Sequence, residues 1–227
     1  MLTREAAEEL GLLPRTLVVK GAMDQTTSAI GAGNFTPGIV TETTGSVMAI
    51  GVTSLRFDPR PVVRLPYMPH VLPGSILCLP YVQTVGSAYK WWRDQFFQEE
   101  VRAAGDREAA YERMNALAAS VPAGSEGVVF LPYLAGAGQP ENDPDARGVL
   151  YGLTLRHGKG HCARAIMESI AYLLRKILAD FRRAGLPVTS GIAPVLRVAV
   201  QSKGCRAGVA FRHVHEAAYL SVGRTLL

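Results

Sequence analysis

Cysteine is scarce in this chain, with three residues among 227. They lie far apart and form no C-x-x-C pair, which argues against a disulfide framework and a zinc site and fits a reducing compartment. Long apolar runs are also absent, since none approaches the roughly 18 residues that a membrane-spanning helix needs. The first nine residues carry four charges with no apolar stretch behind them, which argues against an export signal. We therefore expect a cytoplasmic protein with no membrane association. The cysteines are Cys78, Cys162 and Cys205.

The rest of the composition is that of a folded protein, with 48% hydrophobic and 19% charged residues. It argues against disorder, collagen and coiled coil. The formal net charge is +5, but residues 189–227 hold five basic side chains against one acidic one, so the first 188 residues are nearly neutral. A basic tail without interleaved aromatic residues is a weak indication of nucleic-acid binding. We expect no nucleic-acid partner.

Periodicity and turn residues predict alternating helices and strands, which is typical of an α/β domain. The clearest hairpin joins residues 38–42 to 47–52 through the turn at 43–46. Further strands are expected over residues 16–20, 75–82 and 128–133. Helices are expected over residues 4–10, 25–33, 107–119 and 161–184, and from Gly86 onward.

The common nucleotide-binding and nucleophile motifs are missing. Gly158-Lys159 is followed by glycine, so there is no Walker A loop, and neither G-x-G-x-x-G nor G-x-S-x-G occurs. His157 and His161 are four residues apart, but the glycines between them disfavour a helical zinc face. Surface or helix-capping roles are the better interpretation of both histidines.

Asp24 is expected where the strand over 16–20 gives way to a helix. The carboxyl end of a strand is where α/β sheets place their ligands, so a catalytic or binding role fits. Aspartate is also a favoured N-cap, and capping the helix that begins near Gln25 explains the residue without any catalysis. The pattern alone favours the cap.

Two backbone features could hold a phosphate. The turn at 43–46 offers hydroxyls and closely spaced N–H groups, and a helix beginning at Gly86 offers free N–H groups and the positive end of its macrodipole. An ordinary hairpin turn and an ordinary helix start explain the same residues.

Five short runs stand in a distinctive order: GAMDQ at 21–25, TTGS at 43–46, GSAYKWWRD at 86–94, FLPYL at 130–134, and DPDARG at 143–148 leading to GLT at 152–154. Together they resemble the FGGY family of carbohydrate kinases, with the xylulokinase-like members closest. The resemblance covers about residues 1–188. It implies an incomplete actin-like ATPase fold of the ribonuclease H-like α/β class, with a mixed sheet and flanking helices. It also implies the end of a sugar-binding domain at 1–37, a nucleotide-binding domain at 38–188 and a divergent basic tail at 189–227.

The resemblance implies roles residue by residue. Asp24 matches the catalytic aspartate that takes the proton from the sugar hydroxyl, and Asp24 and Gln25 match substrate contacts. The substrate would be a pentulose or related polyol, phosphorylated from ATP with Mg²⁺, and no metal ligand of this chain is assigned. Nucleotide contacts are implied at five positions: Thr44, Gly45, Ser46, Gly86 and Lys90.

The chain departs from the family pattern at three places. Residues 135–140 read AGAGQP where many members have a Gly-Glu-Arg-x-Pro pattern, and Cys162 stands where an aliphatic residue is usual. After residue 188 the expected Gly-Gly-Gly-Ala loop is replaced by RVAV at 197–200, whose codons permit that loop in a shifted frame. A frameshift and a folded lineage-specific extension are the two explanations of the tail.

The family's first phosphate loop and most of its sugar contacts would lie before Met1. A cleft between two domains cannot close when one wall is absent, so we expect the isolated chain to be inactive. The alternative is a non-catalytic actin-like module that binds nucleotide or a partner protein. The sequence leaves a homodimer open.

Overall fold

The computed structural model describes residues 1–19, 21–57, 65–105, 107–139, 141–188 and 190–194. The hypotheses on the tail at 195–227, including the shifted frame at 197–200, lie outside these residues. Among the described residues, no helix combines the length and apolar content that crossing a bilayer requires.

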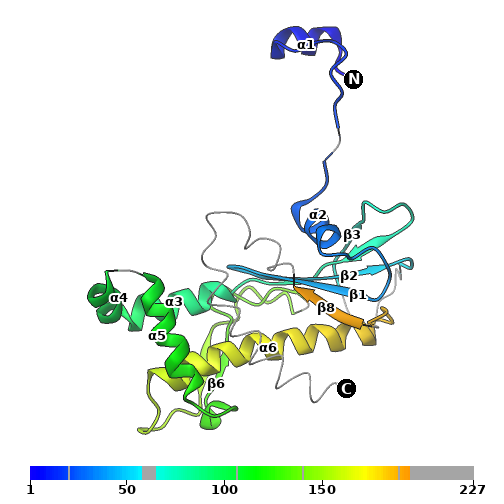
Figure 1. Cartoon of the computed structure of the whole chain (residues 1–227). Coiled ribbons are helices and arrows are strands. Elements are labelled where there is room, and N and C mark those ends of the chain that lie inside the picture. Colours follow the sequence, from blue (N-terminus) through cyan, green and yellow to red (C-terminus); the bar gives the residue numbers. More distant parts are fainter. Residues whose placement is uncertain (20, 58–64, 106, 140, 189, 195–227) are drawn as a thin grey trace.

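A mixed sheet forms the centre of the molecule (Figure 1). Its strands are β1 (Ile39–Thr44), β2 (Met48–Ser54), β3 (Tyr67–Pro69), β4 (Ile76–Cys78), β5 (Tyr81–Val82) and β8 (Ser190–Pro194). The order is β3-β4-β2-β1-β8, with β5 also pairing with β2. All pairs are antiparallel except β1 with β8, which is parallel. The predicted hairpin is confirmed, since β1 and β2 pair from Val40 opposite Val52 to Thr44 opposite Met48.

Helices cover both faces of this sheet, as Figure 1 shows. Alternate residues of β2 point to opposite faces. Met48, Ile50 and Val52 pack in one core with the long helix α6 (Lys159–Arg183). On the other face, Ala49 packs with Ala29 of α2 (Asp24–Gly31). The sheet is therefore the middle of three layers.

A second core lies beside the sheet. It is formed by the first half of α6, by α3 (Gly86–Phe96) and α5 (Arg107–Ala119), and by the ribbon of β6 (Val129–Leu131) and β7 (Val149–Tyr151). Helix α4 (Gln98–Ala104) packs against α5 and α3. A single turn of 3₁₀ helix, Ser125–Gly127, precedes β6. Because α6 runs through both cores, it joins the sheet to the helical part of the molecule.

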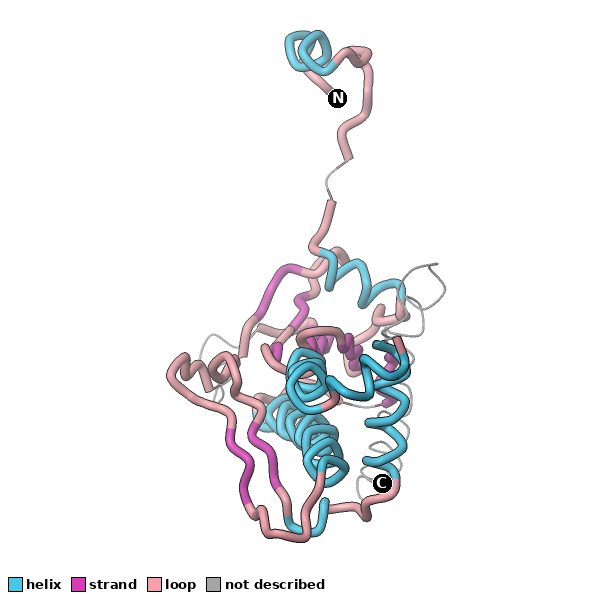
Figure 2. The backbone as a smooth tube through the Cα atoms, turned by 90° about the vertical axis from the view of Figure 1, so that its left-hand side faces the viewer, coloured by secondary structure: helices cyan, strands magenta, loops and turns pink. Residues whose placement is uncertain are grey.

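The N-terminal segment stands away from the body (Figures 1 and 2). Its helix α1 (Arg4–Leu10) is confirmed, and Gly11 ends it in the left-handed region at φ +64°. The strand expected over 16–20 is wrong for residues 16–19, which pair with no strand, while Lys20 lies outside the described residues. Leu17, Val18 and Val19 are 75%, 63% and 85% exposed. These residues are of types that favour strands, but no strand of the described residues lies beside them to pair with.

Other differences have local causes. The strand expected over 75–82 divides into β4 and β5, because Pro80 cannot donate to a ladder and its carbonyl instead accepts the Ile50 N–H at 3.0 Å. The helix expected over 161–184 begins earlier, at Lys159. The sequence analysis did not predict α4 or β7, which are seven and three residues long.

Candidate functional site

The tip of the β1–β2 hairpin is an exposed three-residue turn, Gly45 to Val47. The Gly45 N–H donates to the Val47 carbonyl at 2.8 Å. Within the described part of the chain, the N–H groups of Ser46 and Val47 donate to no protein acceptor. A Cβ placed on Gly45 would meet no atom within 4 Å. The turn therefore offers two unused N–H donors, one exposed hydroxyl and open space above the glycine.

Helix α3 is fixed to this turn through its first residues. The Val85 and Ser87 N–H groups both donate to the Ser46 carbonyl at 3.2 Å, and the Ser87 hydroxyl donates to the same oxygen at 3.0 Å. The Gly86 N–H donates to the Gly45 carbonyl at 3.1 Å. Two segments forty residues apart in the sequence are thus one local structure.

These bonds correct one expectation. The N–H groups of Gly86 and Ser87 are not free to hold an anion, because the turn carbonyls already accept them. The next N–H groups, of Ala88 and Tyr89, donate to the Val85 carbonyl. The unused donors for an anion lie on the turn itself and not at the start of the helix.

Lys90 lies one turn along α3 and is the exposed cation of this region, with 61% of its side chain accessible. Its Nζ is 3.5 Å from Asp94 Oδ2. Arg93 Nε donates to Asp94 Oδ1 at 2.8 Å, and the Arg93 guanidinium lies 4.5 Å from the centre of the Tyr111 ring. Burial would raise the pKa of Asp94, but Arg93 and Lys90 outweigh it and lower the pKa. Lys90 is therefore paired with a carboxylate that Arg93 also holds.

Thr44 contributes less than expected to the surface of the site. It is 4% exposed, and its hydroxyl donates to Glu42 Oε1 beneath the hairpin. The Thr44 side chain thus supports β1 from inside, and the exposed hydroxyl of the turn is that of Ser46.

Asp24 and Gln25 begin α2, on the face of the sheet opposite α6 (Figure 1). No strand precedes them among residues 16–19 and 21–23, so the placement of Asp24 at the carboxyl end of a strand is wrong. The N-cap position falls on Met23, one residue earlier than expected. The exposed Asp24 carboxylate accepts the Gln25 N–H at 2.8 Å. Among the described residues, no hydrogen bond or ion pair joins Asp24 or Gln25 to the turn or to α3.

The two histidines act locally at the start of α6. His161 Nδ1 accepts the Gly158 N–H at 3.1 Å, and His157 Nδ1 accepts the Thr154 N–H at 2.9 Å. The helix-capping interpretation is confirmed for His161, which closes the first turn of α6. The described residues contain no group of three metal-ligating side chains.

Sequence reasoning missed Val47 and Ser87, which the structure adds to the site. Val47 contributes only its backbone N–H, so its side chain gives no signal. Ser87 gives a weak one, because a hydroxyl next to the first helical glycine is common at helix starts.

The comparisons with known proteins agree in one family. Residues 38–200 match the domain described as the C-terminal domain of the FGGY family of carbohydrate kinases. A xylulose kinase of Staphylococcus epidermidis is 30% identical over 195 residues, which are 83% of this chain and 36% of that protein. A gluconokinase of Bacillus subtilis is 32% identical over 181 residues, 75% of this chain and 33% of that protein. The crystal structure of xylulose kinase from Rhodospirillum rubrum matches with 37% identity and a TM-score of 0.66, over 81% of this chain and 35% of that one. The chain thus spans about a third of the length of these relatives.

Proposed function

Because this chain belongs to the FGGY family of carbohydrate kinases and has its actin-like fold, we propose that it carries the nucleotide-binding part of an ATP-dependent sugar kinase. The turn Gly45 to Val47 would hold phosphate oxygens, and Lys90 would neutralise their charge. Asp24 would act as the general base toward a sugar hydroxyl. The substrate would be a pentulose or a related polyol.

One observation carries this proposal. The turn has two unused N–H groups and a free hydroxyl, and hydrogen bonds from the start of α3 hold its carbonyl groups in place. Successive backbone N–H groups form a concave anion site that needs no positive side chain. Four hydrogen bonds from Val85, Gly86 and Ser87 fix the carbonyls of the turn, so its N–H groups are held facing the other way. Preorganised donors of this kind lose little entropy when a phosphate binds.

Magnesium fits the site as a companion of the nucleotide. Mg²⁺ is usually held by one or two carboxylates, water and the substrate phosphates. The described residues form no metal cage of their own. When bound, Mg²⁺ would neutralise phosphate charge.

Asp24 suits proton transfer because its carboxylate is exposed at the first turn of α2. Negatively charged side chains are favoured near a helix N-terminus. An ionised carboxylate can accept the hydroxyl proton as that oxygen attacks the γ-phosphate of ATP. The Asp24 bond to the Gln25 N–H orients one oxygen and leaves the other free for the hydroxyl.

We further propose that the chain binds ATP but does not turn it over by itself. The turn Gly45 to Val47, called the phosphate turn below, supplies its N–H donors and hydroxyl from this chain alone. In contrast, no hydrogen bond or ion pair joins Asp24 to this turn among the described residues. The second candidate, a non-catalytic nucleotide-binding module, is favoured by this same separation. Both predict that the isolated chain binds nucleotide without turnover, and turnover by the chain would exclude the non-catalytic module.

Calorimetric titration with ATP and Mg²⁺ tests the nucleotide site. Lys90→Gln removes the exposed cation, and we expect binding to weaken by roughly 10- to 100-fold, because a charge-assisted contact contributes about 1.5–3 kcal/mol. Lys159→Gln is the matched control, since Lys159 also pairs with a carboxylate, Glu100 at 3.2 Å, but at the start of α6. An intact chain that binds no ATP, or equal losses in both variants, would overturn the assignment of the site.

A kinase assay with xylulose, gluconate and glycerol tests the rest. We expect no turnover by the chain alone. If turnover is found, Asp24→Asn should lower it by at least about 10²-fold while ATP affinity stays constant, because only the base is lost. Turnover that survives Asp24→Asn would remove Asp24 from the mechanism.

A further inference from the structure

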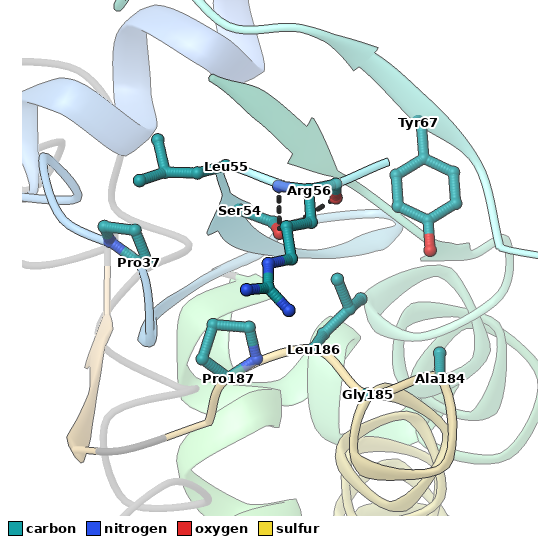
Figure 3. A pocket seen from close by; sticks show the side chains of 9 residues that line it. All are labelled: Pro37, Ser54, Leu55, Arg56, Tyr67, Ala184, Gly185, Leu186 and Pro187. Atoms are coloured by element: carbon teal, nitrogen blue, oxygen red, sulfur yellow. Dashed lines mark hydrogen bonds between the residues drawn. The ribbon is translucent and has the colours of Figure 1, made fainter. Parts of the chain in front are cut away.

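A cavity of about 420 Å³ lies where β2 ends, between that strand and the C-terminal end of α6 (Figure 3). Its volume is within the range of pockets that hold small organic molecules. Pro37, Pro187 and the ring of Tyr67 line it, and Leu186 reaches it from the core that α6 forms with the sheet. Because proline fixes its own backbone and Leu186 is buried, these apolar walls are held in place.

Arg56 supplies the charge of the cavity. Its guanidinium extends between β2 and the end of α6 (Figure 3), and no other charged side chain among the described residues lines the space. The Ser54 hydroxyl donates to the Arg56 carbonyl at 3.0 Å and accepts the Arg56 N–H at 3.1 Å, so the backbone that carries the side chain is fixed. Within the described part of the chain, the guanidinium itself has no hydrogen-bond acceptor and no ion pair.

The end of α6 does not need Arg56 as a cap. The Gly185 and Leu186 N–H groups each donate to a carbonyl of the last turn at 3.0 Å, with Gly185 at φ +71°. In this Schellman arrangement the helix satisfies its last carbonyls with the residues that follow it. Arg182 and Arg183, in the last turn, also offset the partial negative charge of the helix end. The donors of Arg56 are therefore available to a ligand.

We propose that this cavity binds a small organic anion, a carboxylate or a phosphate ester, whose oxygens pair with Arg56 and whose apolar part packs against Tyr67 and the prolines. A guanidinium presents two parallel N–H donors, which match two oxygens of either group. An apolar part adds burial that a bare inorganic ion lacks. This inference is independent of the proposed kinase function, because the cavity and the turn Gly45 to Val47 lie at opposite ends of β2.

Amide NMR shifts of the full chain during titration test the site. Benzoate is the carboxylate probe, phenyl phosphate is the phosphate-ester probe, and benzyl alcohol is the matched neutral probe with the ring alone. We expect saturating shifts with at least one of the two anions, largest at the Arg56 and Leu186 amides, and at least roughly tenfold weaker binding of benzyl alcohol. The anion with the higher affinity identifies the charged group that the cavity accepts. Shifts confined to the phosphate turn, or none with either anion, would overturn the proposal.

Substitution of the arginine tests its role. Arg56→Gln should weaken binding of the anion at least roughly tenfold and leave that of benzyl alcohol unchanged, because only the charged contact is lost. Arg56→Lys keeps the charge without the paired donors, so it should retain only part of the affinity. Arg175→Gln is the control, since Arg175 is exposed on α6 and does not line the cavity.

Circular dichroism checks that each variant is folded. Equal losses in Arg56→Gln and Arg175→Gln, or an affinity for the anion that Arg56→Gln leaves unchanged, would remove Arg56 from the site and overturn the proposal.

Discussion

Lys176 on α6 ties the loop before β7 to the helix. Its Nζ lies 2.7 Å from Glu141 Oε1 and 3.0 Å from Asp180 Oδ2. The Asp180 side chain is fully buried and is also bound by Arg183. Burial would lower the pKa of Lys176, but the Glu141 and Asp180 carboxylates outweigh it and raise the pKa. The charged form of this lysine is therefore part of the folded structure.

We predict that Lys176→Met lowers the free energy of unfolding by about 1–2 kcal/mol at neutral pH. The loss stays below that of a fully buried pair, because Lys176 is 41% exposed and Asp180 keeps Arg183. Since the pKa is raised in the folded state, the contribution of Lys176 is complete below its usual value of 10.5 and is lost as pH rises through the higher folded value. Urea unfolding of both proteins, from neutral pH to above 10.5, should show the difference shrink. A constant difference would contradict the pairing.

The two buried cysteines, Cys78 and Cys162, have pKa values that burial shifts without a charged partner to offset it. Burial raises the pKa of Cys78 to about 12 and raises that of Cys162 as well. Both side chains behave as small apolar groups in the two cores, and neither is a reactive nucleophile at neutral pH.

At the scale of elements, the crossing of α5 and α6 depends on a glycine. A Cβ on Gly160 would lie 2.9 Å from the Leu117 carbonyl oxygen, which is backbone and cannot move alone. The glycine lets the first turn of α6 approach α5 closely, and the second core forms around this contact.

We predict that Gly160→Ala destabilises the chain by about 1–3 kcal/mol, because α5 and α6 must move apart and lose packing. Gly31→Ala is the control: it is also helical, a Cβ there meets nothing within 4 Å, and the change should be neutral or slightly stabilising. Thermal unfolding followed by circular dichroism measures both. Equal effects of the two changes would show that the contact with Leu117 is unimportant.

The elements differ in how far the sequence predicts them. Helices 4–10 and 107–119 are found at the expected bounds, because a helix makes its hydrogen bonds within itself. Gly11 marks the end of the first, and Val121-Pro122 follows the end of the second. A strand needs a neighbour, so residues 16–19 keep a strand-like composition without forming one. The position of the hairpin turn at 45–47 could be predicted for a similar local reason. The use of its carbonyls by Gly86 and Ser87 could not, since that contact joins residues forty positions apart.

At the scale of the whole molecule, the N-terminal segment and the body are separate in their packing. Helix α1 makes few contacts outside its own loop, in which the Leu2 N–H donates to the Thr16 carbonyl at 3.1 Å. The body has two larger cores that share α6 and a smaller apolar cluster between α2 and the sheet. A protease should therefore cleave the N-terminal segment faster than the body.

We predict that trypsin cuts first after Arg15, which is exposed in the N-terminal segment, and that the body survives this cut. Cleavage there needs no unfolding of either core, because accessible backbone with few contacts opens at little cost. Mass spectrometry of a short digestion identifies the product, and circular dichroism reports whether the body keeps its helices. Early cuts within α5 or α6 would contradict this division.

A cavity of about 420 Å³ lies at the end of the sheet remote from the phosphate turn (Figure 3). Pro37, Tyr67 and Pro187 line it, and the Arg56 side chain extends between β2 and the end of α6. Because β2 runs from the hairpin turn to this cavity, the turn and the cavity lie at opposite ends of one strand.

The hydrogen bonds that join the turn to the start of α3 have a consequence for the fluorescence of the protein. Both tryptophans of the chain, Trp91 and Trp92, lie on α3 within two turns of Gly86, and Trp92 is buried in the second core. The turn cannot shift without pulling the helix that bears these indoles. The chain thus contains its own fluorophores next to the turn at residues 45–47, and a ligand bound there as proposed should change the emission of the unlabelled protein.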